Sequence, residues 1–472
     1  MTPQTSNRWL FLAVISVGLL MISADNSILF TALPALRTQL HMSELEGLWV
    51  LNAYSLVISG LLLGTGTLGD RIGHRRMFEI GLVLFALAST LAALAPNVGV
   101  LIASRALLGV GAAVMMPATL ALLRITFQDV RERNLAIAIW GSVATIGAAA
   151  GPVLGGFLLE HFYWGSVFVI NIPIAIVALL ATFLLAPPNV THPTQHWDLL
   201  SSVYAMIAMT GLVLLIKEVA HPSSIWLALG LSLAGSLAFW LRGRRQTQPL
   251  IAFDIFRNRL FSAGVLTALF AMFTQSGVML VTTQRFQLTE GFSPLQAGLL
   301  TAVAALAAFP TSLIGGIFLH RVGFLPLIGG GLSILAAGFF CCYLGAITDT
   351  FGVFILGMLV AGVGAGFAMS VASTAIIGSA PRARSGMASA IEEVSYEFGA
   401  LIAVAVFGTL LAALYTASSG QDASFAEAVD AGAFNHAFEW LLAFAAICTL
   451  AGAVITGWLL RDNPKGTAYD HE

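Results

Sequence analysis

The stretch GTLGDRIGHRR, residues 66–76, places three glycines, one aspartate, one histidine and three arginines between two long apolar runs. In the whole chain only 9% of the residues are charged. A short polar turn between two apolar segments of about 20 residues each is typical of a loop that joins two membrane-spanning helices. The stretch therefore predicts a helical hairpin in a bilayer, with its charge gathered at one membrane surface.

The composition of the remaining chain supports an integral membrane protein. Hydrophobic residues make up 58% of the 472 positions, against roughly 45–50% in soluble domains. The apolar runs are too long for the alternating strands of an outer-membrane barrel, so we expect α-helices. No basic arm or domain stands apart from the loops, which argues against a nucleic-acid partner. Cys341, Cys342 and Cys448 fall inside apolar runs without the spacing of metal ligands, and we expect no metal.

Apolar runs of about 20 residues, separated by charged or Pro/Gly/Asn-rich breaks, predict fourteen spans. The first run lacks a small-residue cleavage site and is interpreted as a retained span rather than a signal peptide. The predicted spans are 10–33, 45–68, 77–96, 99–122, 134–160, 164–186, 199–217, 223–241, 259–283, 294–319, 325–346, 350–377, 386–415 and 436–460.

The distribution of Lys and Arg predicts that both termini face the cytoplasm, because positive loops stay on that side. Of the 21 basic residues, 17 then fall inside, Arg105 lies within a span, and only Arg37, Lys217 and Arg285 fall outside. The 17 are Arg8, Arg71, Arg75, Arg76, Arg124, Arg131, Arg133, Arg242, Arg244, Arg245, Arg257, Arg259, Arg321, Arg382, Arg384, Arg461 and Lys465. We expect a multi-pass protein of a bacterial cytoplasmic (inner) membrane.

A faint internal repeat divides the chain. GTLGDRIGHRR recurs as GIFLHRVGFLP, residues 316–326, at an offset of 250, and Gly109 matches Gly362 at an offset of 253. Chance pairing of glycines in glycine-rich helices is the alternative. The predicted fold is an all-α membrane protein of two pseudo-symmetric six-helix bundles, 1–186 and 259–472. The linker 187–258 would carry two inserted helices.

The opening stretch resembles the signature loop of the major facilitator superfamily. The family pattern G-x-L-x-D-R-x-G-R/K-R/K is met at Gly66, Leu68, Asp70, Arg71, Gly73, Arg75 and Arg76, with His74 shifting the basic run by one position. RALLGVGAA, from Arg105, resembles the family motif of the fourth span. GAAAGPVLGG resembles the antiporter motif of the fifth span through Gly147, Gly151, Pro152, Gly155 and Gly156.

Further segments resemble the 14-span drug:H+ antiporters. They are ADNSILFTALPAL, WVLNAYSL, VFVINIPI and, in the thirteenth span, GMASAIEEVSYEFGALIAVAVFGTL, the last especially like the QacA and SmvA type of pump for quaternary ammonium and other lipophilic cations. The resemblance implies alternating-access export of such cations, driven by the proton gradient, in antimicrobial resistance. It implies no cofactor, and we expect a monomer. Asn52 stands where some relatives carry an acid, and an acid of the tenth span is missing, which leaves divalent cations open.

Acids inside spans are expensive in a bilayer and are candidates for function. Asp25 lies about 12 Å from the outer end of its span, and Arg105 about 9 Å from that of its own. Asn52 belongs to the same layer. One hypothesis is that Asp25 takes up the proton or the cation while Arg105 tunes its charge state. The alternative is a static Asp25–Arg105 pair that joins two helices.

Three further acids lie in the thirteenth span. Glu393 and Glu397 are four residues apart and share a helix face, whereas Glu392 points about 100° away. Two carboxylates held close in a low dielectric repel each other, so that one of them can keep a proton near neutral pH. Such a pair could exchange a proton for an organic cation. The alternative is that Glu392 bonds a neighbouring helix or reaches the interface.

Aromatic side chains could add cation–π contacts to a quaternary ammonium group, although most of the 31 Phe must face lipid or pack. The candidates are Trp49, Tyr54, Phe30, Phe273 and Tyr396.

Two motifs are expected to gate transport. Gly147, Gly151 and Gly155 form a small-residue stripe that allows close helix contact, and Pro152 bends that helix. The resemblance implies that this face meets the other half and stops proton leakage, whereas tight packing alone is the alternative. In the signature loop, Asp70 needs a partner among basic residues, and the resemblance assigns that charge pair to the inner gate.

Three rival functions remain at this stage. A carrier of a neutral or anionic metabolite is disfavoured for anions by four intramembrane acids against one arginine. An intramembrane enzyme is disfavoured because H-E-x-x-H and G-x-S-x-G motifs are missing. A sensor or scaffold would carry no gradient-dependent flux. A G-x-x-x-x-G-K-S/T loop is also missing, which excludes ATP bound by this motif as the energy source.

Overall fold

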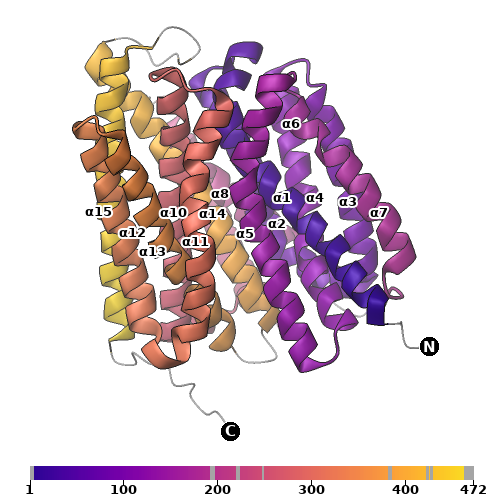
Figure 1. The fold of residues 1–472 in the computed structure, drawn as a ribbon. Helices are drawn as coiled ribbons and strands as arrows, with labels where there is room; N and C mark the ends of the chain where they lie inside the picture. The colour runs from indigo at the N-terminus through magenta and orange to yellow at the C-terminus, as the bar shows by residue number, and fades with distance from the viewer. Residues whose placement is uncertain are drawn as a thin grey trace. The chain divides into compact units, whose positions relative to one another are not determined.

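A computed structural model describes residues 5–191, 197–218, 224–246, 249–380, 385–420, 425 and 429–461, and every regular element among them is helical (Figure 1). The first helices are α1 (Thr5–Leu40), α2 (Glu44–Ile72), α3 (His74–Ala93), α4 (Val98–Thr126), α5 (Val130–His161), α6 (Ser166–Val169), α7 (Asn171–Leu185), α8 (Leu199–Glu218) and α9 (Ile225–Arg245). They are followed by η1 (Phe253–Arg257), α10 (Arg259–Leu288), α11 (Pro294–Val322), α12 (Phe324–Ile347), α13 (Phe351–Gly378), α14 (Ser385–Ser419) and α15 (Ala431–Leu460).

The fourteen predicted spans are confirmed: fourteen helical segments of the described chain are long and apolar enough to cross a membrane. The predicted sixth span is one such segment, Ser166–Leu185, but Ile170 interrupts it and divides α6 from α7. Its sequence includes Pro173, which lacks the backbone N–H that a continuous helix would use there.

Several predicted span ends are wrong, because the helices continue beyond their apolar cores. The predicted ends at residues 33 and 283 fall inside α1 and α10, which reach Leu40 and Leu288. Arg37, Lys217 and Arg285 each lie in the last turn of a helix, where a cation interacts favourably with the helix dipole. All three are buried. Arg382, Arg384 and Lys465, three of the 17 basic residues predicted to face the cytoplasm, lie outside the described residues.

The chain forms two compact units: residues 1–211, 230–242 and 293–298, and residues 212–229, 243–292 and 299–472. In the first unit α3 packs on α4 and α7, and α1 packs on α5 and α7; α3, α4 and α7 are seen side by side in Figure 1. In the second unit α12 packs on α13 and α15, and α10 packs on α14 and α15. The same pairing scheme in both units supports the predicted pseudo-symmetry. The three-part division at residues 187 and 259 stays a prediction.

The repeat is also visible in two equivalent turns. Gly73 is the single residue between α2 and α3 and has φ of 96°, and Gly323 is the single residue between α11 and α12 and has φ of 89°. In each turn the glycine N–H donates to the carbonyl four residues earlier, Gly69 or Leu319, over 2.8 Å. Positive φ strains any residue with a Cβ, so a glycine at both positions is what a one-residue turn between two helices requires.

Close helix contact in the second unit depends on glycines of α12. A Cβ added at Gly338 would lie 2.3 Å from the backbone N of Ala361 on α13. Backbone atoms cannot rotate away as a flexible side chain can, so the two helices would have to separate. At Gly330, on the same helix, an added Cβ meets nothing within 4 Å among the described residues.

We therefore expect Gly338→Val to destabilise the purified protein by about 1–3 kcal/mol through overpacking, while Gly330→Val leaves stability unchanged. Thermal unfolding in one detergent, followed by intrinsic fluorescence, measures both variants. The pair controls for the β-branched side chain itself, since both substitutions place valine in α12. Equal losses of stability would contradict the contact.

Candidate functional site

A buried ion pair joins α1 to α4 in the first unit. The Nη1 of Arg105 donates to Oδ2 of Asp25 over 2.5 Å. The two side chains are 0% and 1% exposed. Arg105 also donates through Nε to the carbonyl of Val50, over 3.2 Å, and lies 4.4 Å from the centre of the Tyr54 ring. The predicted common layer of Asp25 and Arg105 is thus a direct contact.

The second carboxylate oxygen of Asp25 is held by a residue that sequence reasoning missed. Nδ2 of Asn171, on α7, donates to Oδ1 of Asp25 over 2.7 Å and also lies 3.3 Å from the hydroxyl of Ser89 on α3. The signal was present, because Asn171 is an amide side chain in the otherwise apolar segment NIPIAIVALLATFLL. Both oxygens of Asp25 are therefore hydrogen-bonded, each by a partner from a different helix.

Asn52 has a different environment from Asp25. Its side chain is 1% exposed, and neither atom of its amide has a hydrogen-bond partner among the described residues. Tyr54, in contrast, is fully buried and donates to the carbonyl of Ile22 over 3.3 Å. Of the other aromatic candidates in this unit, Phe30 is buried and Trp49 is partly exposed.

In the second unit the candidate carboxylates lie on α14. Glu392 is 7% exposed and accepts a hydrogen bond of 3.1 Å from the hydroxyl of Tyr396, one turn further along. Ser373, on α13, is a second hydrogen-bond partner of Glu392. Glu393 and Glu397 are partly buried on the same helix. The Ser373 contact joins Glu392 to a neighbouring helix, as the alternative to a coupling role foresaw, and a role in coupling stays a prediction for all three acids.

Phe273 belongs to an aromatic cluster. Its ring packs edge-to-face against Phe407 at 5.5 Å and Phe444 at 6.4 Å between centroids. These contacts join α10, α14 and α15, so packing accounts for Phe273 without a ligand.

The signature loop forms the one-residue turn between α2 and α3. Asp70 accepts from His74 over 3.0 Å, one helical turn away, and half of its side chain is exposed. The partner of Asp70 in this structure is therefore the histidine rather than one of the arginines. Arg71 is exposed. Arg75 pairs with Glu79 over 2.8 Å.

The glycine stripe of α5 faces α1, within its own unit. An added Cβ would lie 2.9 Å from the carbonyl of Leu20 at Gly147, 2.8 Å from that of Ala24 at Gly151, and 3.0 Å from a methyl of Ile28 at Gly155. The prediction that this face meets the other half is wrong for these three glycines, because α1 occupies it. Gly66, Pro152 and Gly156 lie within α2 and α5, and their role in gating stays a prediction.

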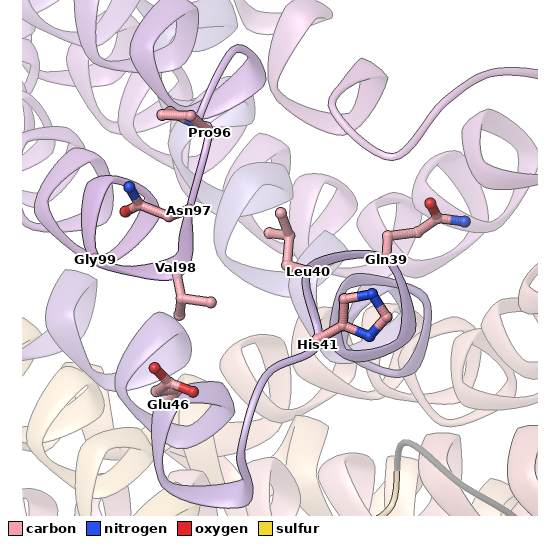
Figure 2. A pocket seen from close by; sticks show the side chains of 8 residues that line it. All are labelled: Gln39, Leu40, His41, Glu46, Pro96, Asn97, Val98 and Gly99. Atoms are coloured by element: carbon pink, nitrogen blue, oxygen red, sulfur yellow. The ribbon is translucent and has the colours of Figure 1, made fainter.

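A surface hollow of about 370 Å³ lies at the helix ends rather than at the ion pair. Figure 2 shows its lining from the α1–α2 turn and from the start of α4, including His41 and Asn97. Gln39, at its edge, is 14 residues from Asp25, or about 21 Å along the helix. Glu46 in its wall is engaged by the backbone and the hydroxyl of Ser43, which begins α2. The hollow is a feature of helix capping and not of the buried charges.

Comparisons with known proteins decide the family. The family model described as Major Facilitator Superfamily matches residues 15–283 and 261–471. The chain belongs to the Major Facilitator Superfamily. It is 36% identical to the multidrug efflux pump LfrA of Mycolicibacterium smegmatis over 422 residues, covering 88% of this chain and 83% of the relative. It is also 36% identical to the methyl viologen resistance protein SmvA of Salmonella typhimurium, covering 87% and 84%.

A solved structure supports the same fold. A bacterial homolog of the human lysosomal transporter Spinster, in an inward-facing and unoccupied conformation, matches with a TM-score of 0.69 at 14% identity, over 97% of this chain and 98% of that one. This member of the Major Facilitator Superfamily is thus a multi-pass membrane transporter and not an enzyme, and its efflux-pump relatives place it with drug exporters.

The Asp25–Arg105 ion pair leads to a prediction about the stability of this transporter. Arg105→Gln leaves Asp25 buried with only Asn171 as partner, and breaking a buried pair costs about 3–5 kcal/mol. We expect Asp25→Asn/Arg105→Gln to be clearly more stable than the sum of the two single losses predicts, because the double variant buries no charge. Unfolding of the four proteins in detergent measures this coupling. Arg71→Gln, at an exposed arginine, is the control, and additive losses would contradict the pairing.

Proposed function

We propose that this protein is a proton-coupled antiporter that exports lipophilic cations, including quaternary ammonium compounds, by alternating access. It acts as a monomer in a bacterial cytoplasmic membrane, with both termini in the cytoplasm. The 17 basic residues that this orientation places inside support it. Of the three outside, Arg37 and Arg285 are neutralised by Glu44 at 2.8 Å and by Glu290 at 3.1 Å. The rule concerns Lys and Arg in loops, so a buried arginine that is paired with an acid is only a minor exception to it.

The observation that carries the proposal is the buried carboxylate of Asp25, which is hydrogen-bonded on both oxygens. A charge in the middle of a bilayer is costly and is retained where it serves ion or proton movement. Asp25 is held by Arg105 from α4 and Asn171 from α7, so protonation would remove the charge that pairs with Arg105 and weaken both contacts. Helix contacts within the unit would then change with the charge of a single side chain, which is what coupling a proton to a conformational change requires.

The acids of α14 supply a second set of exchangeable charges. Glu392 is held by two neutral hydroxyls, those of Tyr396 and Ser373. A proton or a cargo cation can therefore provide the counter-charge that no fixed arginine provides at these two contacts. Glu393 and Glu397, on the same helix, extend this set over about one further turn.

The cargo class rests on the relatives and on charge. SmvA is named for resistance to methyl viologen, a flat organic dication, and LfrA is named as a multidrug efflux pump. Intramembrane acids attract cations and repel anions, and Trp49, Phe30 and Tyr396 offer rings for cation–π contacts. An inward proton gains about 2.3 kcal/mol for each 100 mV of membrane potential, and a monovalent cation that leaves in exchange loses the same amount. A one-for-one exchange is therefore driven by the pH difference, at about 1.4 kcal/mol for each pH unit, without ATP.

Reconstitution into proteoliposomes tests this function. We expect an imposed pH gradient to drive accumulation of tetraphenylphosphonium, a monovalent cation, and of methyl viologen, a divalent one. For a one-for-one exchange of a proton and a monovalent cation, a pH difference of about 1.7 units would sustain about 50-fold accumulation. The variant Asp25→Asn/Glu392→Gln/Glu393→Gln/Glu397→Gln should accumulate neither cation, and Glu160→Gln, at an exposed acid of α5, should match the wild type. Full accumulation by the four-acid variant would sink the proposal.

Neutral and anionic compounds of similar size distinguish a metabolite carrier. They should neither be accumulated nor compete with the two cations. Competition by such a compound as strong as that of unlabelled tetraphenylphosphonium would favour the metabolite carrier instead.

The signature loop gives a separate expectation. Asp70→Asn removes the charge that pairs with His74 and should lower the maximal transport rate about fivefold, since one charge-assisted hydrogen bond contributes about 1 kcal/mol or more. Membrane insertion and yield should not change. Asp349→Asn is a matched control, because Asp349 is an exposed acid in a turn and asparagine tolerates its φ of 50°. A normal rate in Asp70→Asn would remove the loop from the gate.

A further inference from the structure

The one-residue turn of the signature loop offers neither of its helices a capping side chain. α2 ends at Ile72 and α3 begins at His74, so Gly73 serves both helices and has no side chain to offer. The last carbonyls of α2 and the first N–H groups of α3 therefore need partners from elsewhere.

The missing caps come from Asn189, 116 residues further along the chain. Its Nδ2 donates to the carbonyl of Ile72 over 2.9 Å, and its Oδ1 accepts from the backbone N–H of Arg76 over 3.3 Å. One amide side chain thus caps both the C-terminus of α2 and the N-terminus of α3. It also occupies the space beside Gly73, where an added Cβ would lie 2.1 Å from Oδ1 and 2.2 Å from Nδ2.

The signature loop returns the contact by capping α7. Nη1 of Arg75 donates to the carbonyls of Ala186 and Pro187 over 3.3 and 3.4 Å, and Nη2 to that of Phe183 over 3.4 Å. These carbonyls end α7, where a cation is favoured by the helix dipole. Glu79 orients the guanidinium through Nε over 2.8 Å. Each of the two segments therefore caps the other.

The segment that carries Asn189 is stiff. Asn189 follows Pro187 and Pro188, whose rings fix φ and prevent α7 from continuing. Because the two prolines restrict the backbone before Asn189, little conformational entropy is lost when its amide is held in place. This segment leads into α8, the first of the two inserted helices.

We propose that Asn189 is a positioning residue of the transport cycle: together with Arg75 it clamps the signature loop to the end of α7. The clamp fixes the direction in which the loop presents Asp70 and His74. Because of this clamp, a movement of the signature loop would also move the segment that carries Asn189 and precedes α8. The inference rests on the proposed function, in which this loop takes part in gating.

Hydrogen exchange reports the clamp without any transport. In the purified protein, Asn189→Ala should raise exchange of the peptide that spans residues 72–77 about fivefold, as expected for the loss of about one hydrogen bond. Asn189→Asp keeps an acceptor for the N–H of Arg76 and should leave that amide near wild type, while it loses the donor to Ile72. Val190→Ala, at the exposed neighbour, is the control. Unchanged exchange in Asn189→Ala would overturn the clamp.

Transport kinetics separate positioning from a purely structural cap. In proteoliposomes Asn189→Ala should lower the maximal rate about fivefold and leave KM within about twofold, because no cargo contact is removed. Raised exchange with an unchanged rate would overturn the positioning role, as would a lower rate without raised exchange. The rate is measured for downhill flux as well as along a pH gradient. A wild type that transports only downhill would therefore refute proton coupling and leave this comparison intact.

The fit of Asn189 against Gly73 allows a second test. Gly73→Ala adds both backbone strain at positive φ and a clash with the amide. Gly73→Ala/Asn189→Gly removes the clash and keeps the strain, so it should recover part of the yield and thermal stability lost in Gly73→Ala. A double variant no better than the single one would overturn the contact.

Discussion

A charged side chain within a lipid-spanning helix needs a partner from the protein, because hydrocarbon supplies none. In the first unit this requirement determines which helices meet. Asp25 accepts hydrogen bonds from Arg105 on α4 and from Asn171 on α7. Arg105 also donates to the carbonyl of Val50 on α2. Four helices are thereby held to one carboxylate. These polar contacts act together with the close packing of α1 against the glycine stripe of α5 to select the face that α1 turns inward.

The same requirement operates at the ends of the first helix of each unit. Arg37 ends α1 and pairs with Glu44, which begins α2. Arg285 ends α10 and pairs with Glu290 in the turn before α11, with Asn435 as a second partner. The two arginines are 248 residues apart, close to the repeat offset seen in the sequence. A buried arginine thus joins α1 to α2 in the first unit, at the end opposite the helix–Gly–helix turn, and a buried arginine ties the end of α10 to the turn that follows it in the second.

The sequence predicts the spans well, because the length of a span follows directly from the length of its apolar run. It also predicts that Asp25 and Arg105 lie at a similar depth, because the number of residues from the end of a helix gives the depth of a side chain in the membrane. It does not predict the true helix ends, since α1 and α10 continue past their apolar cores and carry a paired arginine in the last turn. Nor does it indicate which face of α5 is covered, because a glycine stripe records close approach and not the identity of the neighbour. Asn189 gives no local signal at all: its partners lie more than 100 residues earlier in the chain.

The two sets of intramembrane acids differ in the kind of partner that holds them, and this difference has a consequence for coupling. Asp25 has a permanent counter-charge in Arg105, so its pairing must be broken before it can accept a cation. The contacts of Glu392 with Tyr396 and Ser373 are both neutral, so a cation can approach it without displacing another charge. An acid of the first kind suits a conformational switch, because its protonation breaks contacts between helices. An acid of the second kind suits binding, because a proton or a cargo cation can add the positive charge that its two hydroxyl contacts lack. In the proposed antiport cycle, the switch would therefore lie on α1 and the exchange of charges on α14.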